Sequence, residues 1–133
     1  QSVHQLGGFR VQGRDESGAA RLLADAQAQQ EAGATLIVLE AIPSPLAAQV
    51  TDRLVIPTIG IGGGAGCDGQ ILVYQDMLGL FSDYTPKFVK RFANLGQEMT
   101  KAFKAYDQEV KAGTFPDESH TFKIDDDILK RIY

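Results

Sequence analysis

The sequence predicts an α/β fold, and more specifically the C-terminal portion of a (β/α)8 barrel of the TIM type. Apolar runs at 35–39, 55–61 and 71–74 have the length of strands. They show little polar alternation, which is typical of parallel sheets covered on both faces. A helical pattern precedes the first run and another separates the first two, as in βα units. Three strands are too few to close a barrel. We therefore expect the chain to supply the last three strands of the barrel and its C-terminal helices.

The composition is that of an ordinary globular domain, with 133 residues, 44% hydrophobic and 23% charged. The net charge of −4 and the scattered basic residues argue against nucleic-acid binding. A single cysteine, Cys67, excludes an internal disulfide and fits a reducing, cytoplasmic location. No apolar run approaches the roughly 20 residues that span a bilayer. Because the chain starts at Gln1 and not at Met, we expect it to be a piece of a longer one.

The first helix is predicted over 17–32. Residues 1–14 before it read as a loop, in which His4 is expected to be solvated. Asp15, Glu16 or Ser17 supplies a cap at the start of the helix, where acidic residues suit the helix dipole. The helix should end at a glycine in the usual C-terminal position. That residue is Gly33.

The strand at 35–39 carries four consecutive branched aliphatics, Leu36 to Leu39, which predicts cover on both faces. Glu40 follows at the C-terminal end of this strand. In α/β barrels and open α/β sheets, that end is where catalytic side chains are placed. The position alone is equally compatible with a carboxylate that leaves the strand for solvent or pairs with a nearby Lys or Arg.

The next helix is predicted over 45–53, with Ser44 as its N-cap and Pro45 as its first residue. Its core-facing residues are Leu46, Val50 and Leu54. Strands at 55–61 and 71–74 follow, and Pro57 is tolerated near a strand start.

An amphipathic helix is predicted over 84–112 and ends at Gly113. Its apolar residues recur at helical spacing, as expected of core or of a subunit contact. They are Phe88, Val89, Phe92, Leu95, Met99, Phe103, Tyr106 and Val110. The tail 114–133 contains a turn at Pro116-Asp117 and then a short helix capped around Asp125–Asp127, whose apolar face is Ile128, Leu129 and Ile132.

A glycine cluster lies between the second and third apolar runs. Its members are Gly60, Gly62, Gly63, Gly64, Gly66 and Gly69. The pattern lacks the helix and the distant acidic residue of a dinucleotide fingerprint, and it lacks the Gly-Lys-Ser/Thr of a P-loop. Backbone contact with a small anionic ligand and tight turn geometry both explain it. Cys67 has no partner expected of a nucleophile, and Asp68 and Asp76 are expected to make local hydrogen bonds in turns.

Several motifs occur in an order and spacing that resemble one enzyme family. They are Gly7 to Arg14, Val38-Leu39-Glu40, Ile56 to Gly62, Asp68 to Val73, and Pro86-Lys87-Phe88. The chain resembles ketopantoate hydroxymethyltransferases over roughly residues 1–122. The resemblance implies that 1–122 is the C-terminal half of the barrel domain and that 123–133 is a tail with a short helix.

The resemblance also implies an activity. Members of the family transfer a hydroxymethyl group from 5,10-methylenetetrahydrofolate to 3-methyl-2-oxobutanoate, giving 2-dehydropantoate for pantothenate biosynthesis. A Mg²⁺ ion chelates the keto acid and stabilises its enolate as a Lewis acid. The family members form rings, commonly a decamer, with subunit contacts from C-terminal helices.

Glu40 is similar in position to the catalytic base of the family, which removes the proton beside the keto group and requires partial burial to do so. Val73 and Gly62 match positions that line the substrate site. The metal ligands and the lysine of the family lie upstream of Gln1, so we expect no metal site in this chain and activity only with the N-terminal half. The alternatives are another carbon–carbon lyase of the phosphoenolpyruvate/pyruvate superfamily, or a non-catalytic oligomerisation or ligand-binding module.

Overall fold

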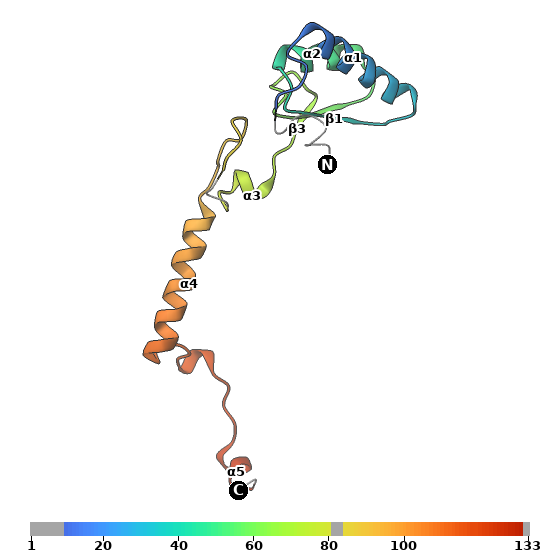
Figure 1. Cartoon of the computed structure of the whole chain (residues 1–133). Coiled ribbons are helices and arrows are strands. Elements are labelled where there is room, and N and C mark those ends of the chain that lie inside the picture. Colours follow the sequence, from blue (N-terminus) through green and yellow to red (C-terminus); the bar gives the residue numbers. More distant parts are fainter. Residues whose placement is uncertain (1–9, 81–83, 132–133) are drawn as a thin grey trace. The chain divides into compact units, whose positions relative to one another are not determined.

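The computed structural model describes residues 10–80 and 84–131. His4, the start of the 7–14 motif and Ile132 of the tail lie outside these residues. The chain divides into two compact units, residues 1–93 and residues 94–133. The first is an α/β unit with a small parallel sheet, and the second contains helices only among its described residues (Figure 1).

The first unit begins with α1 (Glu16–Glu31), and both of its ends lie within one residue of the predicted 17–32. Asp15 is the N-cap, and its Oδ1 accepts a hydrogen bond from Gly18 N at 2.7 Å. Gly33 follows the helix with φ of +94°, a left-handed conformation that suits glycine after a helix end. The residues that begin and end α1 are adjacent to it in the sequence, which is why the helix could be predicted from sequence alone.

The three strands pair in parallel in the order β1 (Ile37–Glu40), β2 (Thr58–Ile61) and β3 (Gly69–Gln70). The register aligns Glu40 with Ile61 and Gln70 with Gly60. A parallel sheet was therefore predicted correctly.

All three strand predictions were wrong in extent, the first by the least, since β1 covers 37–40 and not 35–39. The third run continues the ladder only through Ile71 N, which donates to Gly60 O at 3.0 Å, and Tyr74 already begins α3 (Tyr74–Met77). Residues 55 and 56 do not join β2, because their amides donate to the Gln30 side-chain oxygen of α1 at 2.7 and 3.3 Å.

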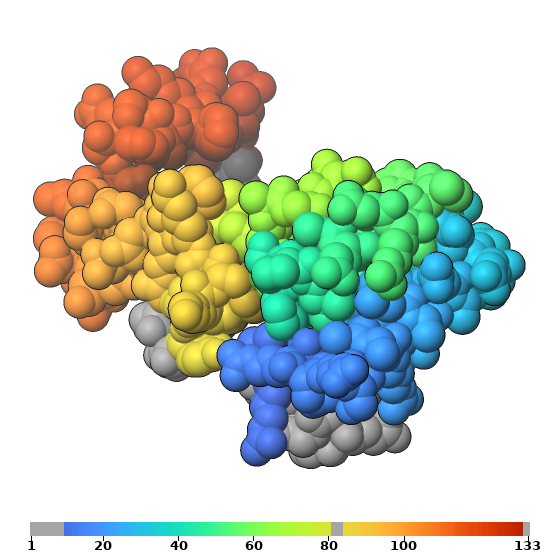
Figure 2. All heavy atoms as spheres, turned by 90° about the horizontal axis from the view of Figure 1, so that it is seen from above, coloured from blue at the N-terminus to red at the C-terminus, as the bar shows by residue number. Residues whose placement is uncertain are grey.

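Helix α2 (Ser44–Arg53) lies beside α1 on one surface of the first unit (Figure 2). It starts one residue earlier than predicted, with Pro43 and not Ser44 as the N-cap. The Pro43 carbonyl already accepts from the amides of Leu46 and Ala47, both at 3.0 Å, so no side-chain cap is used. The three predicted core residues of this helix, Leu46, Val50 and Leu54, are buried.

The core of the first unit lies between the sheet and these two helices. It consists of Ala26, Ile37, Leu39, Ile42, Ala47, Val50 and Leu54. Along β1 burial alternates, with Ile37 and Leu39 buried and Val38 48% exposed. The prediction that both faces of this strand are covered was therefore wrong for the described residues, because the helices pack on one face only.

The second unit carries α4 (Leu95–Ala112), a 3₁₀ turn (Glu118–His120) and α5 (Asp126–Leu129). The predicted helix over 84–112 starts eleven residues too early. Residues 84–94 are irregular instead, and those up to residue 93 belong to the first unit. Gly113 ends α4 at φ of +70°, and Asp125 caps α5 through Asp127 N at 2.9 Å, both as predicted. The domain boundary after residue 122 stays a prediction.

Candidate active site

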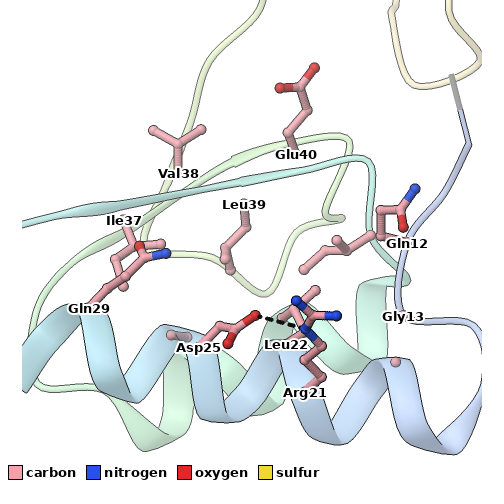
Figure 3. Close-up of a pocket in the computed structure, with 13 residues that line it drawn as sticks. Gln12, Gly13, Arg21, Leu22, Asp25, Gln29, Ile37, Val38, Leu39 and Glu40 are labelled. Atoms are coloured by element: carbon pink, nitrogen blue, oxygen red, sulfur yellow. Dashed lines mark ion pairs between the residues drawn. The ribbon is translucent and has the colours of Figure 1, made fainter. Parts of the chain in front are cut away.

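Glu40 is the last residue of β1, at the carboxyl edge of the parallel sheet. Figure 3 shows its side chain on the same side of the strand as Val38 and opposite Leu39, which extends toward α1. The side chain is exposed, and none of the interactions within residues 10–80 and 84–131 involves its carboxylate. The partial burial predicted for this residue is therefore absent from the described part of the chain, because its side of the sheet is uncovered.

The backbone immediately after Glu40 is held firmly. Ala41 has φ of +51°, a left-handed conformation that costs a non-glycine residue roughly 1–2 kcal/mol. Its amide donates to Ile61 O at 2.9 Å and its carbonyl accepts from Gln12 N at 3.2 Å. These bonds tie the end of β1 to β2 and to the segment before α1, so the strand end that carries Glu40 has a defined direction.

Residue Gly62 follows directly after Ile61, the register partner of Glu40. It has φ of +77°, and a Cβ placed on it would lie 2.7 Å from the ring of Phe88. Gly62 and Phe88 also line a cavity of about 360 Å³. Its remaining walls are Gly64, Gln70, Ile71 and Leu72. The register therefore brings Glu40 and the start of the loop at Gly62 together at one edge of the sheet.

Val73, the other predicted substrate contact, lies just beyond β3 as the N-cap residue of α3. It is 47% exposed and does not line the cavity at Gly62. Its role as a substrate contact stays a prediction, as do the same role for Gly62 and the role of Glu40 as base.

A second cavity, of about 480 Å³, lies between α1 and β1 (Figure 3). Its walls combine the buried Ile37 and Leu39 with polar side chains of α1, including an Arg21–Asp25 ion pair at 3.6 Å. Glu40 is also among the residues that line this cavity, but its side chain extends away from α1 (Figure 3). We therefore place the candidate site on the open face of the sheet and not in this cavity.

The glycines have a structural explanation that the sequence pattern did not provide. A Cβ on Gly64 would overlap the Ser44 side chain, and one on Gly66 would lie 2.8 Å from Ala48 Cβ. The loop thus lies directly on the small residues of α2, which requires glycine at the closest approaches. This packing favours the turn interpretation for Gly64 and Gly66. Gly62, which directly follows the register partner of Glu40, lies at the edge of the sheet instead.

Asp68 does not make the local turn contact expected of it. Its Oδ2 accepts from Thr58 N at 2.8 Å and from Thr58 Oγ1 at 3.2 Å, ten residues away in sequence. Sequence reasoning missed this pair. The available signal was Thr58 itself, a polar residue in an otherwise apolar strand, and it is fully buried.

The described residues contain neither a metal cluster nor a membrane-spanning helix. In the part of the chain that the structure describes, no three His, Cys, Asp or Glu side chains are grouped so that they could hold a metal ion. Among the same residues, every helix is too short or too polar to cross a membrane.

Comparison with known proteins gives a consistent result. Residues 1–118 match the family model of ketopantoate hydroxymethyltransferase. The chain is 58% identical to a 3-methyl-2-oxobutanoate hydroxymethyltransferase of Enterococcus faecalis and 59% identical to one of Clostridium novyi, covering 100% of this chain and 48% of each relative. A third, from Syntrophus aciditrophicus, is 57% identical over 92% of this chain and 45% of its own length. The chain spans about half the length of the curated relatives it matches.

Proposed function

The chain belongs to the ketopantoate hydroxymethyltransferase family, and from this premise we propose the reaction of the protein that carries it. The protein transfers a hydroxymethyl group from 5,10-methylenetetrahydrofolate to 3-methyl-2-oxobutanoate, giving 2-dehydropantoate in pantothenate biosynthesis. The observation that carries the proposal is the identity of 58% over the whole chain to a curated relative of that name.

Glu40 is the base in this proposal. The reaction requires removal of the proton on the carbon beside the keto group, and a carboxylate within hydrogen-bond reach of that carbon can accept it. Glu40 supports the role by its place at the carboxyl edge of the sheet and by the bonded backbone that follows it. Its carboxylate has no partner among the described residues, so it is available to a substrate.

The chain supplies only part of the catalytic unit, which we propose is a (β/α)8 barrel completed by an N-terminal half. The uncovered face of β1 supports this, because Val38 is 48% exposed there and Leu36, just before the strand, is 45% exposed. Large aliphatic side chains on a parallel strand normally pack inside a protein. Strands from the other half would cover this face and enclose Glu40.

Magnesium chemistry fits the reaction class, since a divalent cation polarises a keto oxygen as a Lewis acid. The residues described here do not by themselves fit such an ion, because they contain no group of three suitable donors. We therefore propose that its ligands lie outside this chain, in the N-terminal half.

The apolar stripe of α4 is exposed, and a face of this kind is typical of a subunit contact. It consists of Leu95, Met99, Phe103, Tyr106 and Val110. We propose that the complete protein forms a ring-shaped homo-oligomer, such as a decamer, in the cytoplasm, where a single cysteine stays reduced.

The test is hydrogen exchange at the substrate carbon in the complete protein with Mg²⁺ and without folate. Wild-type protein should exchange the C3 hydrogen of 3-methyl-2-oxobutanoate for deuterium. Glu40→Gln should lower the exchange rate by about 10²–10⁴-fold, because the amide cannot accept the proton. The matched control is Glu31→Gln, an exposed carboxylate at the end of α1, which should exchange like wild type.

Two results would contradict the proposal in different ways. Undiminished exchange in Glu40→Gln, with circular dichroism unchanged, would remove Glu40 from the role of base. Absence of both exchange and hydroxymethyl transfer in the wild type would instead favour a non-catalytic module that has kept the fold.

A further inference from the structure

The connection between β2 and β3 is unusually short for two parallel strands. Parallel neighbours are normally joined by about a dozen residues or more, usually including a helix. Here residues 62–68 make the whole return, with no helix between Ile61 and Gly69. The chain must run back along the length of β2 and start β3 in the same direction. We call residues 62–68 the glycine crossover.

The crossover takes the place of a helix by packing its backbone directly on its neighbours. A Cβ on Gly63 would lie 3.4 Å from Ala47 Cβ of α2 and 3.5 Å from the Leu39 carbonyl oxygen of β1. A side chain at position 63 would therefore contact both α2 and the backbone of the residue just before Glu40. Because Gly63 carries no side chain, the crossover approaches the end of β1 with its backbone, and a shift of the crossover would change the packing there.

Both ends and the middle of the crossover are anchored. At its start, Gly62 continues from Ile61, whose carbonyl accepts from Ala41 N at 2.9 Å. In its middle, Gly64 O accepts from Gln70 Nε2 at 2.8 Å. At its end, Asp68 Oδ2 accepts from the amide and the hydroxyl of Thr58.

The Asp68 anchor is the one that rests on a buried polar group. Thr58 is 0% exposed, and its Oγ1 also lies 2.7 Å from Thr51 Oγ1 of α2. The three side chains form a chain of hydrogen bonds from α2 through β2 to the end of the crossover. Leaving the buried hydroxyl and amide of Thr58 without an acceptor would cost free energy of folding. The two hydrogen bonds therefore hold the Asp68 side chain in this position.

We propose that Asp68 is a positioning residue for the candidate site. By holding the end of the glycine crossover at Thr58, it fixes Gly62 and Gly63 against β1 and thereby sets the wall of the site beside Glu40. This inference rests on the proposed function. It adds a residue that acts through the crossover and not through contact with the substrate.

The experiment compares Asp68→Ala and Asp68→Asn with wild type in the complete protein. Asp68→Ala removes the acceptor, whereas Asp68→Asn keeps an oxygen that can accept from Thr58 N. The control is Asp52→Ala, which removes an exposed carboxylate of α2 that has no bond among the described residues. Hydrogen–deuterium exchange is followed by mass spectrometry in peptides covering residues 56–72, and KM for 3-methyl-2-oxobutanoate is measured with kcat per folded protein.

In Asp68→Ala, amide exchange in these peptides should rise about 10–100-fold, as expected for loss of hydrogen bonds to a charged acceptor. KM for the keto acid should rise about tenfold while kcat per folded molecule changes less than about threefold, because a displaced wall weakens binding in ground and transition state alike. Asp68→Asn should restore both values to within about threefold of wild type, and Asp52→Ala should not change them.

Two outcomes would overturn the inference. Unchanged amide exchange in Asp68→Ala would show that the anchor does not hold the crossover. Faster exchange with a wild-type KM, and activity reduced only in proportion to the folded fraction, would show that Asp68 stabilises the fold without shaping the site. Wild-type protein without activity would contradict the proposed function instead, and the amide exchange would still decide whether Asp68 anchors the crossover.

Discussion

The two units of the chain build their helices from similar local signals but differ in what those helices bury. In the first unit, α2 buries Leu46, Ala47 and Val50 against the sheet. In the second, α4 is longer and has a clear apolar stripe, yet none of its residues is buried. Isolated helices are marginal in water, and most helical stability in proteins comes from packing. The helices of the first unit are therefore stabilised by packing within the unit. Packing of α4 would require a surface that the described residues do not provide.

The largest expected contrast is between apolar residues of the two units. Leu39→Ala should lower the free energy of unfolding by about 2–5 kcal/mol, because Leu39 is 5% exposed in the core. Phe103→Ala removes a larger side chain, but Phe103 is 67% exposed, so the loss should stay below about 0.5 kcal/mol. Urea unfolding of the chain, followed by circular dichroism, measures both.

A matched control lies in the same strand as Leu39. Val38→Ala should cost less than about 1 kcal/mol, because Val38 is 48% exposed. A large loss of unfolding free energy in Phe103→Ala would contradict this contrast, since it would mean that the stripe of α4 is covered in solution. A cost for Val38→Ala that grows when the chain is extended upstream would support the proposed barrel.

Two glycines, one in each unit, test the same difference in packing. Gly64 and Gly113 have φ of +79° and +70°, so alanine meets similar backbone strain at both positions. Only at Gly64 would the new Cβ overlap another residue, Ser44, whereas nothing lies within 4 Å at Gly113. Gly64→Ala should cost about 2–4 kcal/mol and Gly113→Ala about 1 kcal/mol. Equal losses in urea unfolding would refute the close packing of the crossover on α2.

The smallest expected effect concerns two exposed caps, one in each unit. The pKa of Asp15 is lowered from its ordinary value of 3.8 chiefly by the hydrogen bond from Gly18 N. That of Asp117 is lowered from the same value by hydrogen bonds from Ser119 and His120. A folded-state pKa below the unfolded one means that each carboxylate stabilises its cap above pH 3.8, and that this contribution is lost as the pH falls through the lowered value.

Carbon-13 NMR of the side-chain carboxyls tests this by titration between about pH 2 and 6. Both midpoints should lie below 3.8, and the turn at Glu118–His120 should loosen in acid before the core of the first unit does. None of the described residues of the second unit is buried, so the turn has only exposed contacts, such as that of His120 with the Phe115 ring, once its cap is protonated. A midpoint at or above 3.8 for either group would mean that its cap is not formed in solution.

The sequence predicted the elements whose signals are local. Asp15 and Gly33 marked the ends of α1, and the spacing of Leu46, Val50 and Leu54 identified the buried face of α2. The position of Glu40 at a strand end also followed from the sequence, whereas its role as base stays a prediction.

The errors occurred where distant contacts decide the conformation. Phe88 and Phe92 fit a helical stripe, but Phe88 lies against Gly62 and the Phe92 amide donates to Met77 O at 2.7 Å. The glycine crossover depends on Thr58 and Asp68, whose bond joins residues ten positions apart and has no local signature. Cover for the second face of β1 was expected from a run of aliphatics, and the described residues do not supply it.

The alternation of β1 limits how this part of the chain can change in evolution. Val38 and Glu40 share one side of the strand because side chains alternate with a period of two (Figure 3). Insertion or deletion of one residue within the strand would turn Glu40 toward α1 and bring Leu39 to the open side. Tolerated gaps are therefore expected in the turns around Gly33 and Pro43, and not between Ile37 and Glu40.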